Sequence, residues 1–126
     1  MTEPRIVRRD ELSEFYIGER CHVVEHWNSA GDASVSIARI RVAPGTTTQL
    51  HRLRGTAERY LIQSGRGRIE IGGLAPADIG PGDTAFIPAD TAQRIANPGD
   101  GDLVFLAICT PRFVPECYEN LEAQDA

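Results

Sequence analysis

The sequence predicts an all-β fold in a single domain. Short runs in which apolar and polar residues alternate, or in which β-branched residues are frequent, recur along most of the chain. Clusters of Gly, Pro, Asn and Asp separate these runs and supply the residues that tight turns require. The length of 126 residues leaves room for one compact domain. Strands of this length and spacing are typical of a sandwich or a barrel.

Each predicted strand is a short run bounded by turn residues such as Pro-Gly, Gly-Gly or Asn-Pro-Gly. The tail adds one helical signal, because Pro115 suits the first position of a helix, and we expect a short helix over 115–121. The predicted strands cover residues 15–17, 21–27, 34–42, 48–51, 58–64, 67–71, 84–87, 93–97 and 103–109.

Composition excludes several classes of function. The net charge of −5 and the absence of a basic tail argue against nucleic-acid binding. All 13 basic residues are arginine, so Schiff-base chemistry through a lysine is excluded. No apolar run is long enough to span a membrane, and no signal-peptide pattern follows the charged N-terminus, so we expect a cytoplasmic protein. The cysteines are three in number and irregularly spaced, and we expect free thiols.

Two linked segments in the middle of the chain have distinctive spacing. They are Gly45-x5-His51-x-Leu53-x4-Glu58-x6-Gly65 and Gly82-x5-Pro88-x-Asp90-x2-Gln93-x3-Asn97. This spacing resembles the paired motifs of the cupin superfamily over about the central half of the chain. The resemblance implies an antiparallel β-barrel, a double-stranded β-helix or jelly roll, with a short C-terminal helix. It places the conserved-motif core at about 34–110 in one domain, 1–126, between N-terminal strands at 5–27 and a C-terminal tail at 111–126.

The chain departs from the family pattern at three positions. In that pattern the first motif supplies two histidines and a glutamate to a metal, and the second motif supplies a third histidine. Leu53 stands at the second histidine position, Gln93 stands at the third, and Asp90 replaces the usual glycine. The resemblance therefore implies a barrel with half of its metal ligands changed.

The remaining ligands form a mixed candidate metal site of His51, Glu58 and Gln93. Residues two apart on a strand share a face, and a turn after His51 would bring Glu58 close to it. Imidazole, carboxylate and amide oxygen suit one divalent ion such as Fe, Mn, Ni or Zn. The alternative is a metal-free interior in which the three side chains hydrogen-bond to one another, because buried polar groups must be paired.

Other residues are candidates for binding a substrate or ligand. Arg39, Arg41 and Arg54 could make bidentate contacts to the carboxylate or phosphate of a small anion. Leu53 would make one wall of the cavity apolar, and Cys109 ends a strand near the expected mouth. Gln93 could donate a hydrogen bond to a ligand through its amide N–H, or coordinate a metal through its amide oxygen.

Two functions remain open from these residues. The first is a metal-dependent dioxygenase, isomerase or lyase acting on a small, oxygen-rich, anionic substrate, with Glu58 as general base and Tyr60 as proton donor. The second is a non-enzymatic, metal-free barrel that binds a small sugar-like or anionic ligand. The resemblance also implies a homodimer, in which the segment 5–17 adds to the sheet of a neighbouring copy and covers an exposed edge.

Overall fold

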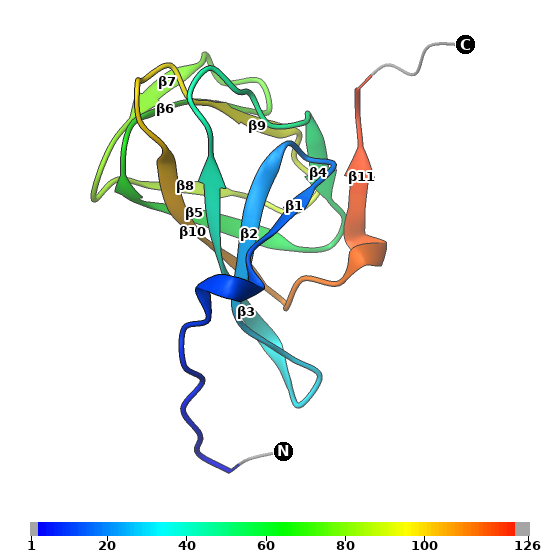
Figure 1. The fold of residues 1–126 in the computed structure, drawn as a ribbon. Coiled ribbons are helices and arrows are strands. Elements are labelled where there is room, and N and C mark those ends of the chain that lie inside the picture. Colours follow the sequence, from blue (N-terminus) through cyan, green and yellow to red (C-terminus); the bar gives the residue numbers. More distant parts are fainter. Residues whose placement is uncertain (1–2, 123–126) are drawn as a thin grey trace.

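The computed structural model describes residues 3–122 and consists of two antiparallel sheets that face each other as a barrel (Figure 1). The larger sheet has the strand order β1-β2-β3-β10-β5-β8, and the smaller has the order β11-β4-β9-β6-β7. The strands are β1 Phe15–Ile17, β2 Cys21–Ser29, β3 Asp32–Val42, β4 His51–Leu53, β5 Ala57–Ser64, β6 Gly67–Ile71, β7 Ala77–Ile79, β8 Thr84–Ile87, β9 Gln93–Ala96, β10 Leu103–Thr110 and β11 Tyr118–Asn120.

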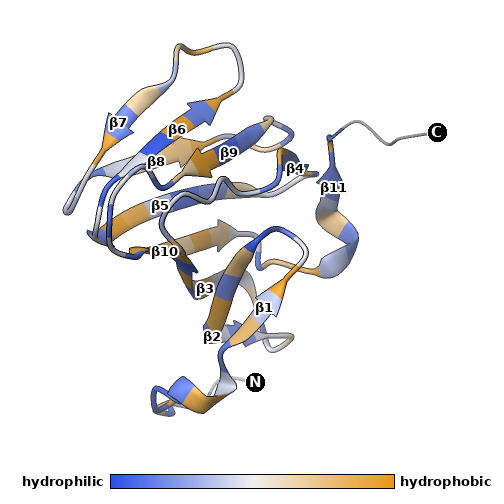
Figure 2. Cartoon of the chain, turned by 45° about the horizontal axis from the view of Figure 1, so that its top comes forward, coloured by the Kyte–Doolittle hydropathy of each residue, from blue (hydrophilic) through white to orange (hydrophobic). Residues whose placement is uncertain are grey.

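Alternation of buried and partly exposed residues explains why these segments are strands. In β10, every second residue from Leu103 to Cys109 is buried, and the residues between them are half-buried. Figure 2 shows hydrophobic and hydrophilic bands along strands such as β2 and β5, whereas β10 is hydrophobic along almost all of its length. The inward-facing residues meet in one large core, in which the rings of Tyr60 and Phe105 lie 4.3 Å apart. This period of two confirms the all-β prediction.

The motif residues include turn positions that need a left-handed backbone. Gly65 has φ of 76°, and a Cβ there would lie 2.4 Å from the carbonyl oxygen of Asp102. Asp90, at the position where the family pattern has glycine, also has a positive φ of 64°. Its carboxylate accepts a hydrogen bond of 3.0 Å from the backbone N–H of Gly55. Aspartate tolerates this conformation better than most residues because its short side chain can bond locally.

The predicted strands are present with small shifts, apart from the strand expected at 48–51. There the regular strand begins only at His51, and Thr48 instead bonds to Ile95 through both its backbone N–H and its hydroxyl oxygen. The predicted C-terminal helix is reduced to a 3-10 turn, η2, Pro115–Cys117. Beyond it the chain forms β11, because Tyr118 to Asn120 pair with the open edge of β4.

The N-terminal segment contains one 3-10 turn, η1, Glu11–Ser13, before β1. β1 lies at the edge of the larger sheet and pairs with β2 of the same chain.

In residues 3–122, no helix has the length and apolar character needed to cross a bilayer.

Candidate functional site

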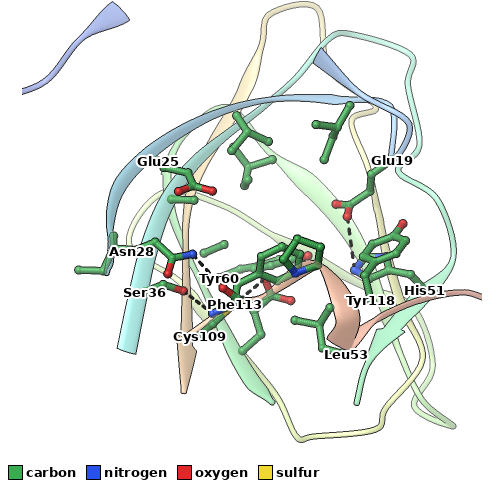
Figure 3. Close-up of a pocket in the computed structure, with 18 of the residues that line it drawn as sticks. Glu19, Glu25, Asn28, Ser36, His51, Leu53, Tyr60, Cys109, Phe113 and Tyr118 are labelled. Atoms are coloured by element: carbon green, nitrogen blue, oxygen red, sulfur yellow. Dashed lines mark hydrogen bonds and ion pairs between the residues drawn. The ribbon is translucent and has the colours of Figure 1, made fainter. Parts of the chain in front are cut away.

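A cavity of about 500 Å³ lies inside one end of the barrel, between the two sheets and the C-terminal segment. Its walls are mostly apolar, and its polar groups are concentrated in a few side chains (Figure 3). The apolar lining includes Phe15, Ile17, Val23, Trp27, Ile37, Ala38, Ile40, Leu53, Ala107, Phe113 and Pro115. The polar lining consists of Glu19, Glu25, Asn28, Ser36, Gln49, His51, Glu58, Tyr60, Cys109 and Tyr118.

His51 is the first residue of β4, and its side chain is only 2% exposed. Its Nδ1 lies 2.7 Å from the carbonyl oxygen of Gln49. Since a carbonyl can only accept, Nδ1 carries the proton and Nε2 is an acceptor in the neutral ring. Burial lowers the pKa of His51, which favours this neutral form. The ring of Tyr118 stacks on the imidazole at 4.8 Å, and its hydroxyl donates to the side-chain oxygen of Gln49.

Glu58 lies on β5 and is buried. Gln93 donates an N–H to one of its oxygens at 2.8 Å, and the thiol of Cys109 approaches the other at 3.7 Å. Burial raises the pKa of Glu58 to about 7, and the charge of Glu19 adds to this rise. The carboxyl group therefore gains or loses a proton near neutral pH.

Glu19 is a site residue that the sequence did not predict. It lies in the turn between β1 and β2, and its side chain is 13% exposed. Its Oε1 is 3.7 Å from Nε2 of His51, as Figure 3 shows. Burial raises its pKa to about 7. No sequence signal marks it, because a charged residue in a Gly-Glu-Arg turn is normally exposed.

Leu53, Tyr60 and Cys109 also face this cavity. Tyr60 is buried against Phe105, and burial keeps its pKa well above the ordinary value, so the phenol stays neutral. Leu53 is buried with Cys109 and Cys117 in a small apolar cluster. Burial also raises the pKa of the Cys109 thiol, which disfavours the nucleophilic thiolate.

The predicted ligand-binding arginines lie elsewhere. Arg39 and Arg41 pair with Glu11 and Glu14 on the opposite face of β3, because Ala38 and Ile40 take the inward positions. Arg54 is exposed and donates to the backbone oxygen of Glu116. The residues that line the cavity include three glutamates and no arginine or lysine. The structure therefore provides no arginine contact for an anion in this cavity.

The residues present do not fit the metal that the family pattern implies. Gln93 turns an N–H toward Glu58, which uses the amide as a hydrogen-bond donor to the carboxylate. Leu53 is buried at the second histidine position and offers no donor atom. Among residues 3–122, no group of three or more His, Cys, Asp or Glu side chains is arranged to hold an ion. Structural and catalytic transition-metal sites normally use three or four such ligands.

Comparison with known proteins identifies the family. A family model described as a cupin domain matches residues 38–109. An oxalate-binding protein of Thermotoga maritima is 35% identical over 71 residues, which cover 56% of this chain and 58% of that protein. This chain thus spans less than two thirds of that relative.

Two further matches extend over more of the chain. An uncharacterized protein of Methanocaldococcus jannaschii is 32% identical over 97 residues, 77% of each chain. The crystal structure of a predicted oxalate decarboxylase from Thermotoga maritima superposes with a TM-score of 0.76 and 25% identity, covering 85% of this chain and 99% of that one. With a family model that covers more than half of its length, this chain belongs to the cupin family.

Proposed function

We propose that this chain binds a small organic molecule inside the barrel without a resident transition metal. The observation that carries the proposal is the cavity of about 500 Å³, which is the size of typical small-molecule sites. Its apolar walls and few polar groups also match such sites. The lack of a suitable ligand set for a metal favours this function over the metal-dependent reactions expected from the motifs.

Oxalate is a poor candidate ligand for this cavity. The Thermotoga relative is named as an oxalate-binding protein, and oxalate is a small dianion. Here Glu19, Glu25 and Glu58 line the cavity and no arginine or lysine does. Like charges at short range repel, and an anion normally needs a cationic or N–H donor partner. An uncharged or positively charged ligand suits the cavity better.

A binding experiment with an uncharged fluorescent probe tests this function. Prodan, a neutral naphthalene dye, is titrated into the protein while the emission of Trp27 is followed. Trp27 lines the cavity and is the only tryptophan in the sequence, so energy transfer from it to the dye reports binding near the cavity. We expect saturable quenching of Trp27 with a matching rise in dye emission.

Two matched variants test whether the dye binds inside the cavity. Ala38→Leu fills part of the cavity, and we expect it to weaken dye binding at least tenfold. Ala33→Leu adds the same side chain at an exposed position of β3 and should leave binding unchanged. Thermal melts confirm that both variants are folded. Unchanged binding in Ala38→Leu, or no saturable binding to the parent protein, contradicts the proposal.

A second candidate function is acid–base catalysis on the bound molecule, and one observation favours it. The pKa of Glu58 lies at about 7, which is the range in which a carboxyl group can both accept and donate a proton. Tyr60, which also lines the cavity, keeps its proton and could donate a hydrogen bond. Turnover that is lost in Glu58→Gln even when the compound saturates the variant would support catalysis. Binding without turnover supports a pure binding role.

We also propose that two copies associate through the N-terminal segment. Ile6, Leu12 and Tyr16 are 75%, 97% and 61% exposed, and β1 has a free edge in the larger sheet. A second copy would cover both the apolar side chains and the edge. Light scattering after gel filtration should give the mass of a dimer, and Leu12→Glu combined with Tyr16→Glu should give a monomer. A parent protein that is monomeric at micromolar concentration contradicts this proposal.

A further inference from the structure

We propose that the ligand carries a protonated amine, which Glu19, His51 and Glu58 hold while the apolar walls hold the rest of the molecule. This inference rests on the proposed binding function and names its ligand class.

The first support is the geometry around His51. Gln49 fixes the proton on Nδ1, so Nε2 presents a lone pair. Oε1 of Glu19 lies 3.7 Å from Nε2, and an ionised carboxylate is also an acceptor. Two acceptors face each other at a distance too long for a direct hydrogen bond. One nitrogen that carries several N–H groups can donate to both.

The second support is the surplus of acceptors near Glu58. Its carboxylate has contacts to the Gln93 amide and the Cys109 thiol, but no ion pair. Glu58 itself lines the cavity, so a ligand there can reach its carboxylate. Buried acceptors without donors cost free energy, so a donor-rich ligand would be stabilised there. An ammonium group has three N–H donors and no acceptor.

The third support is the charge of the cavity. Glu19, Glu25 and Glu58 all line it, and no arginine or lysine among residues 3–122 does. Burial raises the pKa values of Tyr60, Tyr118, Cys21 and Cys109, so these phenols and thiols keep their protons. Arg20, close to this end, is engaged by Glu122 in a two-point ion pair. The charged groups of the cavity lining are therefore acidic, and they would attract a cationic ligand.

The apolar walls set the shape of the rest of the molecule. Val23, Trp27 and Ile37 from β2 and β3, together with Phe113 from the tail, line the same cavity. Asn28 and Ser36 hold Phe113 by hydrogen bonds to its backbone, as Figure 3 shows. An aromatic or branched aliphatic body is the best match to this surface. The predicted class is therefore an arylalkyl or alkyl amine.

Three matched compounds test the amine directly. Phenethylamine, 2-phenylethanol and 3-phenylpropionate share a phenylethyl body and differ in the terminal group. Each is titrated at pH 8 and low salt, with Trp27 emission as the signal. We expect phenethylamine to bind at least tenfold more tightly than the alcohol, and the carboxylate to bind most weakly.

Charge-removing variants locate the amine. Glu19→Gln and Glu58→Gln should each weaken phenethylamine binding at least fivefold and change 2-phenylethanol binding less than twofold. Glu116→Gln, an exposed residue outside the cavity lining, is the matched control and should change neither.

The outcomes separate the two levels of the proposal. Equal binding of amine and alcohol, or full amine affinity in both glutamate variants, overturns the amine inference and leaves the binding function standing. Binding of prodan without any binding of phenethylamine also overturns the amine inference and leaves the binding function standing. If neither prodan nor any of the three compounds binds, the binding function and the amine inference both fail.

Discussion

Glu58 is a buried carboxyl group whose charge no arginine or lysine neutralises. Its pKa is raised from 4.5 to about 7, mainly by burial. Between about pH 4.5 and pH 7, the folded protein therefore keeps a proton on Glu58 that the unfolded chain has already released. This contribution to stability is complete below about pH 4.5 and is lost as the pH rises to about 7. Glu19 acts in the same direction over the same window.

Replacing Glu58 with glutamine should make the protein more stable at alkaline pH. The amide keeps the shape of the protonated acid and never ionises. We expect the free energy of unfolding of Glu58→Gln, relative to that of the parent, to increase by on the order of 2 kcal/mol between pH 5 and pH 8. Urea unfolding at several pH values measures this difference.

The exposed ion pairs provide an internal control for this pH dependence. Arginine partners lower the pKa values of Glu11, Glu14 and Glu70, so their contribution is lost only as the pH falls below the ordinary range of a glutamate. Glu116→Gln, which changes an exposed side chain outside the cavity lining, is the matched surface substitution. A Glu58→Gln curve that runs parallel to that of the parent from pH 5 to pH 8 would show that Glu58 titrates normally.

At the scale of elements, β4 and β9 bring the altered motif positions together. His51 of β4 is paired with Gln93 on the neighbouring strand β9 of the smaller sheet. Leu53 lies two residues further along β4, on the same inward side. The strand geometry that the family pattern needs is therefore retained, and only the side chains differ.

Restoring the two histidines should therefore restore a metal site. The variant Leu53→His with Gln93→His would combine three imidazoles with the carboxylate of Glu58, a ligand set suited to nickel or manganese. We expect it to bind Ni²⁺ at least a hundredfold more tightly than the parent, measured by calorimetry on metal-stripped protein without an affinity tag. The single variant Gln93→His should be intermediate. A folded double variant with the affinity of the parent would mean that these positions do not converge.

The elements also explain what the sequence could and could not predict. Long strands such as β3 and β10 could be predicted because β3 alternates polar and apolar residues over much of its length and β10 is an apolar run bounded by turn residues. The three-residue strands β7 and β11 are too short for a periodic signal, and β11 forms only because the edge of β4 is available. The contact between Glu58 and Gln93 follows from the motif spacing. Glu19 does not, since only the folded turn directs it inward.

At the scale of the whole molecule, packing and cavity occupy different parts of the barrel. The largest fully buried side chains include Phe105, Ile62 and Ile95, and none of these lines the cavity. The cavity is bounded instead by β2, β3 and the C-terminal segment, where many apolar residues are only partly buried. Core and cavity lining share Val23, Ile40, Tyr60 and Ala107. Outside this overlap, stability and ligand binding should depend on different residues.

Two truncations test this division. Phe105→Ala removes a ring that is 1% exposed in the packed core and should lower the free energy of unfolding by about 3–5 kcal/mol. Ile37→Ala removes partly buried atoms that already border the cavity, so it leaves no new closed void and should cost about 1 kcal/mol. Ile37→Ala should also weaken prodan binding, because the dye loses part of its apolar wall. Urea unfolding and the Trp27 titration measure the two effects separately, and equal destabilisation by both truncations would mean that the cavity wall is as tightly packed as the core.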